Sequence, residues 1–250
     1  MKEGTDLEAD DDDSMFQIEE AGDGDQFMAV KPWMGVVKNS VPTSYKPTSR
    51  DGDAPDANLE LEYIHGYRCH DARNNLRYTA TGEVTYHAAA VGVVLNQKTN
   101  TQRFFIQHTD DLHCMAVDAS GKFCATGQIG NFPTICVWNN ETMECVARIS
   151  GTLRKGIKNL AFSPDGRYLA ASAFDDEHCI AVYAWNAKLK PGETIKPIAT
   201  GKGTRANILS LGFNLAGNQL VGTCVKEVNF YTFDNALVKC KRGTGWTNNM

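Results

Sequence analysis

The chain has 250 residues, 42% of them hydrophobic and 22% charged, so it is long enough to bury a sizeable core. Its formal net charge is −5, and no stretch approaches the ~18 consecutive apolar residues that a membrane-spanning helix needs. We therefore expect no membrane partner. The N-terminus has no apolar signal-peptide core, and none of the eight cysteines forms a CxxC pair, so we expect small buried thiols in a reducing compartment.

Charge is unevenly distributed along the chain. Residues 1–25 hold eleven acids and one base, a net charge of −10, and the rest holds 24 bases and 19 acids, a net charge of +5. This pattern suggests a basic body that can meet an anionic partner, with an acidic tail that competes for the same surface as one alternative. A solvated, disordered leader over residues 1–25 is the favoured interpretation. The aspartate run Asp10–Asp13 is not followed by the glycine of an EF-hand loop, so we assign it no calcium.

Residues 26–58 contain four prolines and predict an extended segment that lies along a surface. Its apolar run, residues 27–37, predicts docking onto another part of the protein or onto a partner. Within this run Trp33 is a candidate anchor, because an aromatic ring supplies much contact area.

The next segment, Tyr63–Leu76, is the densest polar cluster in the chain, and it runs into the apolar stretch of residues 78–95. Such a cluster beside a buried strand predicts an active site, a recognition surface or a hydrogen-bonded structural knot. As an active site it offers His65, His70, Asp71 and His87, with the thiol of Cys69. Their spacing matches no metal-ligand or nucleophile motif, so we assign no catalytic, cofactor-binding or metal-binding residue and expect no enzyme.

Two readings of the cluster remain. Arginines interleaved with tyrosines, as in Arg68, Arg73 and Arg77 with Tyr67 and Tyr78, suit single-stranded nucleic acid, but no nucleic-acid-binding motif accompanies them and we expect no such partner. The structural knot is favoured, because buried polar groups satisfy one another within a cluster. Its predicted members are Tyr67, Arg68, His70, Asp71, Arg73 and Asn75.

From about residue 108 the chain repeats a pattern of strand, glycine turn and strand. The turn glycines Gly121, Gly166 and Gly217 lie 45 and then 51 residues apart. A third strand follows each pair, and a fourth is predicted at 145–149, 195–198 and 237–240. Four strands at this period are typical of β-propeller blades. The units resemble WD repeats, which implies structural roles for His108, Thr126 and Trp138.

Three such units do not close a propeller, so we expect further strands from residues 59–107 or from chain beyond Met250. The departures from the WD pattern are Gln107, Asn139 and Phe233, which stand where Gly, Asp and Trp are usual. Residues 244–250 read as the start of another strand. The fold class is therefore all-β, a partial WD-repeat β-propeller of about three blades plus the segment before it.

The polar segment identifies a family. Gly66–Leu76, Gly82–Tyr86 and Ala89–Val94 resemble the hydrophobic motif of the echinoderm microtubule-associated protein-like family, and Lys31–Lys38 resembles the stretch that leads into it. This resemblance implies a motif at 59–107 followed by WD-repeat blades at 108–250. It also implies atypical tandem propellers, with the motif partly buried between them.

The same resemblance implies the function. The expected partner is tubulin or microtubules, with other microtubule-associated proteins as further partners, in the cytoplasmic cytoskeleton and, as one alternative, a ciliary axoneme. A body of +5 suits the acidic outer surface of tubulin. A general WD-repeat scaffold without tubulin contact is the alternative function. The candidate contacts are Lys31, Trp33, Lys38, Arg68 and Arg73.

Overall fold

The computed structural model describes residues 36, 39–46, 48, 57–188, 194–234 and 236–244. Two compact units divide the chain, Met1–Gly52 and Asp53–Met250. In the first unit the described residues form a short turn, in which the backbone N–H of Tyr45 donates to the carbonyl of Pro42 over 2.9 Å. All the strands belong to the second unit, whose described residues include no helix long and apolar enough to cross a membrane.

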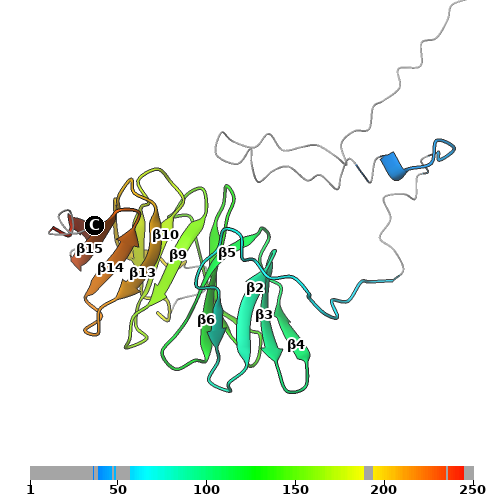
Figure 1. The fold of residues 1–250 in the computed structure, drawn as a ribbon, viewed down its shortest axis with the longest axis horizontal. Helices are drawn as coiled ribbons and strands as arrows, with labels where there is room; N and C mark the ends of the chain where they lie inside the picture. Colours follow the sequence, from blue (N-terminus) through cyan, green and yellow to red (C-terminus); the bar gives the residue numbers. More distant parts are fainter. Residues whose placement is uncertain are drawn as a thin grey trace, which may run out of the picture. The chain divides into compact units, whose positions relative to one another are not determined.

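Four successive four-stranded antiparallel units make up the second unit, and Figure 1 shows them following one another in chain order. The first of these sheets lies inside the segment expected to hold the family motif. Its strands are β1 (Leu76–Tyr78), β2 (Val84–Ala88), β3 (Val91–Asn96) and β4 (Thr101–Phe105). The segment expected to hold the motif therefore contains a whole sheet, in addition to the three units that the repeats predict.

The remaining three sheets follow the predicted repeats. The second contains β5 (Leu112–Val117), β6 (Phe123–Gln128), β7 (Thr134–Asn139) and β8 (Cys145–Ser150). The third contains β9 (Ile157–Phe162), β10 (Leu169–Ala173), β11 (Ile180–Tyr183) and β12 (Pro197–Gly201). The fourth contains β13 (Ile208–Phe213), β14 (Gln219–Cys224), β15 (Glu227–Asp234) and β16 (Leu237–Arg242). A single parallel pair, Thr200 with Leu237, joins the third and fourth sheets through β12 and β16.

One strand differs from its prediction. The fourth strand of the third sheet was expected at 195–198, but β12 runs from Pro197 to Gly201. Its register with β11 begins where Pro197 faces Tyr183. Proline at the first residue of a strand removes no ladder hydrogen bond that the sheet needs, which fits this later start.

Each repeat closes its first hairpin with the same turn. Gly121, Gly166 and Gly217 have φ of 71°, 71° and 69°, a left-handed conformation that glycine adopts without steric cost. A polar side chain at the start of the turn accepts backbone N–H groups: Asp118 Oδ1 accepts from Phe123 over 2.8 Å, and Asn214 Oδ1 accepts from Gln219 over 3.1 Å. The sequence repeat is thus a repeat of turn chemistry.

Two of these glycines offer a matched test, because only one of them meets a neighbouring sheet. A Cβ on Gly121 would lie 2.7 Å from the backbone nitrogen of Ala80, whereas a Cβ on Gly166 would meet nothing within 4 Å. We expect Gly166→Ala to cost about 1 kcal/mol through its left-handed backbone. Gly121→Ala should cost roughly 1–3 kcal/mol more, because backbone must move. Urea unfolding of both variants measures the difference, and equal losses would contradict the close approach.

The hydrophobic core lies between successive sheets. One buried cluster joins the first and second sheets, one joins the second and third, and one joins the third and fourth. The first of these contains Val94, Phe105, Met115, Cys124, Cys136 and Trp138. Because each sheet buries its faces against its neighbours in the chain, the array is stabilised through successive interfaces.

The cysteines are free thiols, but they are not uniformly buried as expected. Cys114, Cys124, Cys136 and Cys224 are buried, and Cys145 and Cys179 are half-buried. Cys69 and Cys240 are exposed, because Cys69 lies outside the sheets and Cys240 lies on the outer strand β16. In the described part of the chain, no group of three or more His, Cys, Asp or Glu residues is arranged to hold a metal ion.

Candidate functional site

The polar segment is organised around Arg68, whose side chain is buried although it is charged. Its guanidinium grips the carboxylate of Asp71 with two hydrogen bonds, Nε to Oδ1 over 2.7 Å and Nη2 to Oδ2 over 2.6 Å. Its remaining nitrogen, Nη1, donates to the backbone carbonyl of Leu112 over 3.0 Å. Leu112 is the first residue of β5, so Arg68 fastens the segment to the second sheet.

A second pair of residues closes the loop from within. The side-chain amide of Asn75, which is 2% exposed, donates to the carbonyl of Arg68, and its Oδ1 accepts the hydroxyl of Tyr67 over 2.6 Å. The ring of Tyr67 lies edge-on to Tyr86 of β2, with centroids 6.1 Å apart. These contacts hold residues 67–75 as one closed turn immediately before β1.

The preceding residues lie along the first sheet. The backbone of Ile64 exchanges two hydrogen bonds with the side chain of Gln102 on β4, over 2.7 and 3.0 Å. The Ile64 side chain packs against Val84, Tyr86 and Val93. Residues 63–67 therefore cover part of one face of the first sheet.

The other predicted knot residues lie at the edge of the cluster. His70 is exposed, and its Nε2 lies 3.3 Å from Asp71 Oδ1. Arg73 is exposed and has no hydrogen bond or ion pair with any described residue. Among the candidate contacts in the leader, Lys31, Trp33 and Lys38 lie outside the described residues.

Strand alternation separates the arginines from the tyrosines of the same segment. In β1, Leu76 faces Tyr86 and Tyr78 faces Val84, so these side chains share one face of the sheet. Arg77 faces Thr85 and lies on the opposite face. Arg77 and Tyr78 therefore do not share one surface of the first sheet.

A buried network in the second sheet confirms the positions expected from the WD-repeat resemblance. His108 Nε2 lies 2.8 Å from Thr126 Oγ1, which also accepts the indole N–H of Trp138 over 3.1 Å. The other ring nitrogen of His108 lies 2.9 Å from Gln128 Oε1. The sequence analysis did not identify Gln128. Gln128 lies two residues after Thr126 on β6, and alternate residues of a strand share a face, so its position could have indicated it.

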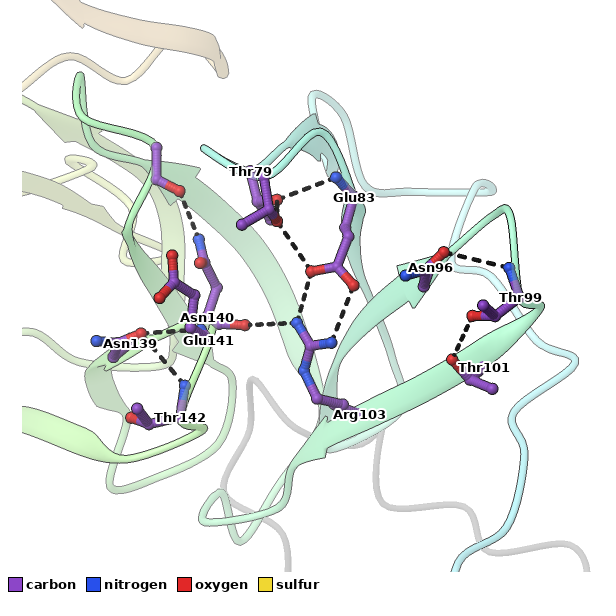
Figure 2. Close-up of polar contacts among 12 residues, drawn as sticks. Thr79, Glu83, Asn96, Thr99, Thr101, Arg103, Asn139, Asn140, Glu141 and Thr142 are labelled. Atoms are coloured by element: carbon purple, nitrogen blue, oxygen red, sulfur yellow. Dashed lines mark hydrogen bonds and ion pairs between the residues drawn. The ribbon is translucent and has the colours of Figure 1, made fainter.

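Arg103 forms a second bridge between the first two sheets, and it carries no motif that sequence analysis could have used. Figure 2 shows its guanidinium between the Glu83 carboxylate and the backbone of Asn140. The distances are 2.9 and 2.6 Å to Glu83 and 3.2 Å to the Asn140 carbonyl. Asn140 in turn donates to the carbonyl of Gly121 over 2.8 Å. The ion pair lowers the pKa of Glu83 and keeps it charged.

The buried histidines of this region are neutral. Burial lowers the pKa of His87, His108 and His113 to about 4 in each case. His87 is fully buried, and neither of its ring nitrogens has a hydrogen-bond partner among the described residues. Burial thus holds the His87 imidazole neutral inside the first sheet.

The pKa of His87 predicts an acid sensitivity. Its folded pKa lies below its unfolded value of about 6.5, so the unfolded chain takes up a proton that the folded chain refuses. Stability is therefore complete above about pH 6.5 and falls as the pH falls toward 4. Between about pH 7 and pH 5, the free energy of unfolding should fall by about 1–2 kcal/mol less in His87→Leu than in the unsubstituted chain. Urea unfolding measures this, with the exposed His65→Leu as control; parallel losses in all three proteins would contradict it.

Comparison with known proteins assigns the two sequence features. Residues 54–93 match the HELP motif, and residues 143–182 match the WD domain, G-beta repeat. The chain is 32% identical over 203 residues to echinoderm microtubule-associated protein-like 4 of Xenopus laevis. The aligned region covers 76% of this chain and 21% of that protein. The chain belongs to the echinoderm microtubule-associated protein-like family.

Two other relatives match a similar share of the chain. Echinoderm microtubule-associated protein-like 1 of Homo sapiens is 28% identical over 203 residues, 76% of this chain and 24% of that protein. The ciliary WD repeat-containing protein ctxp80 of Euplotoides octocarinatus is 36% identical over 194 residues, 70% of this chain and 26% of that protein. The chain thus spans about a quarter of the length of the curated relatives it matches.

The family features map onto the sheets with an offset. The HELP match ends in β3, so it includes the polar segment and most of the first sheet. The WD match, residues 143–182, starts just before β8 and extends into β11. One sequence repeat therefore contributes the outer strand of one sheet and three strands of the next, which links adjacent sheets covalently.

Proposed function

We propose that this chain is part of a non-enzymatic microtubule-associated protein that binds tubulin or microtubules and organises or stabilises the cytoskeleton. The observation that carries the proposal is the similarity over the HELP motif and the sheets to relatives named as microtubule-associated. A relative named as ciliary supports a ciliary microtubule as the location. The net charge of +5 outside residues 1–25 gives the body attraction for an acidic surface.

Among the candidate contacts, the proposal assigns different roles to the two arginines. Arg68 is buried and its three hydrogen-bonded nitrogens are engaged, so it positions the motif rather than touching a partner. Arg73 is exposed and free to make a contact. Lys31, Trp33 and Lys38 keep their proposed contact role from the sequence alone.

Cosedimentation with polymerised tubulin over a salt series tests the proposal. Exposed charges are screened as the Debye length falls from ~30 Å at ~0.01 M to ~8 Å at ~0.15 M salt, so the pelleted fraction should decrease over this range. The chain without microtubules must stay in the supernatant. A folded chain that does not pellet at the lowest salt would refute tubulin binding and favour a scaffold for other proteins.

A further inference from the structure

A hollow of about 200 Å³ lies where the first strands of the four sheets come together. Each of these strands, β1, β5, β9 and β13, is an end strand of its sheet, so its inner edge carries backbone groups that no neighbouring strand pairs. The residues that line the hollow are Arg73, Asn74, Arg77, Cys114–Val117, Asn159–Phe162, Ser210 and Leu211.

The charge of this hollow has one sign. Arg73 and Arg77 both line it, and the described lining includes no acidic residue. Arg73 has no hydrogen bond or ion pair with any described residue, and Arg77 makes only a long contact of 3.4 Å with the carbonyl of its neighbour Leu76. Arg68, by contrast, has its carboxylate partner. Two guanidinium groups therefore face the hollow without an internal counter-charge.

The size of the hollow and its hydrogen-bond donors indicate which kind of ligand it can bind. A hollow of about 200 Å³ has room for several waters, or one or two side-chain carboxylates, and not for a folded domain. Guanidinium groups bind carboxylates with two parallel hydrogen bonds, so the hollow suits one or two carboxylate side chains. Tyr78, the tyrosine of β1, lies on the opposite face of the sheet from Arg77.

We propose that the hollow binds one or two carboxylate side chains of an acidic peptide segment of the protein partner, through Arg73 and Arg77. This proposal rests on the proposed function only in naming the source, which is then an acidic segment at the microtubule surface. The ligand chemistry stands on the hollow itself and is measured without microtubules.

The first experiment uses a fluorescein-labelled decaglutamate peptide and the whole chain, with binding followed by fluorescence anisotropy. All proteins carry the substitutions Asp10→Asn, Asp11→Asn, Asp12→Asn and Asp13→Asn, which lower the competing negative charge of the chain itself. We expect Arg73→Gln combined with Arg77→Gln to weaken binding at least tenfold. The matched control, Arg154→Gln with Arg205→Gln, removes two other exposed arginines that do not line the hollow, and should bind as the parent does.

The outcomes separate the site from its source. If both double variants lose peptide binding equally, or if neither loses it, the hollow is not the binding site. A single-stranded oligonucleotide of equal charge tests the selectivity for carboxylates. If the parent binds it as tightly as the peptide, and Arg73→Gln with Arg77→Gln weakens that binding too, carboxylate selectivity is overturned. The unfolding temperature of each variant confirms that the protein is folded.

The second experiment tests the source by adding unlabelled decaglutamate to the cosedimentation assay. Release of the parent from microtubules, with weak pelleting of the Arg73→Gln, Arg77→Gln variant, supports the microtubule segment as the ligand. Normal pelleting of this variant overturns that source. Failure of every protein to pellet, with peptide binding intact, instead contradicts the proposed function and removes the microtubule source.

Discussion

Replacing Trp138 by alanine is expected to lower the free energy of unfolding by about 3–5 kcal/mol, the usual range for deleting a large buried aromatic side chain. Trp138 is 0% exposed, and its ring stacks on Phe105 with centroids 5.0 Å apart and planes 4° apart. Its indole N–H also donates to Thr126, so the substitution leaves a cavity and removes one of the hydrogen bonds of that hydroxyl. Because this core joins the first and second sheets, the loss should appear as a lower midpoint of urea unfolding.

Phe132→Ala is the matched control for this substitution. Phe132 is 88% exposed, and its removal should change the free energy of unfolding by less than about 0.5 kcal/mol. If Trp138→Ala were as mild as Phe132→Ala, the two sheets would not depend on the aromatic stack for their packing.

Replacing Arg68 by methionine is expected to cost about 2 kcal/mol, because it keeps an unbranched apolar stem and removes the guanidinium with its donors. The Leu112 carbonyl then loses a charged donor, and the Asp71 carboxylate loses its two hydrogen bonds. Asp71 has a side chain that is 37% exposed, so water offsets part of its loss. Arg73→Met, at an exposed arginine of the same segment, serves as control and should be nearly neutral. Urea unfolding at neutral pH measures both.

The acid dependence of the same variant identifies the ion pair as the cause. The hydrogen bonds from Arg68 lower the pKa of Asp71 to about 2, below its unfolded value of about 3.9. The stabilisation is therefore complete above the unfolded pKa and is lost as the pH falls through about 2. The difference in stability between the unsubstituted chain and Arg68→Met should be largest above about pH 4 and shrink toward pH 2. A difference that stays constant over this range would point to packing of the arginine stem instead.

Much of the fold follows from local sequence. The repeats from residue 108 predicted the second, third and fourth sheets, because turn glycines and alternating apolar residues are local signals. The boundary of β12 was less accurate, because a strand of the outer edge is fixed by its pairing with β11 rather than by its own pattern. The first sheet was not predicted as a separate sheet, because β1 has only three residues. Its turn glycine, Gly82, has the left-handed conformation of the repeat glycines, with a φ of 77°, but was not aligned with them.

The polar cluster shows the same division within a single segment. Its residue types predicted a set of paired side chains, and the pairing of Arg68, Asp71 and Asn75 agrees with that interpretation. The sequence did not distinguish Arg68 from Arg73, since both are arginines in one loop. Only the approach of β5 decided between them, by offering the carbonyl of Leu112 to one and leaving the other exposed.

By itself, the sequence determined the family, the all-β class and the repeated turns, because motif residues, strand alternation and glycine conformation are properties of neighbouring residues. The tertiary structure decided which charges are paired, that Gln128 and Arg103 complete buried networks, and that Arg77 joins Arg73 at the hollow. These outcomes depend on residues far apart in the chain. Their free energies come from desolvation and hydrogen-bond geometry, which are set only when the sheets pack together.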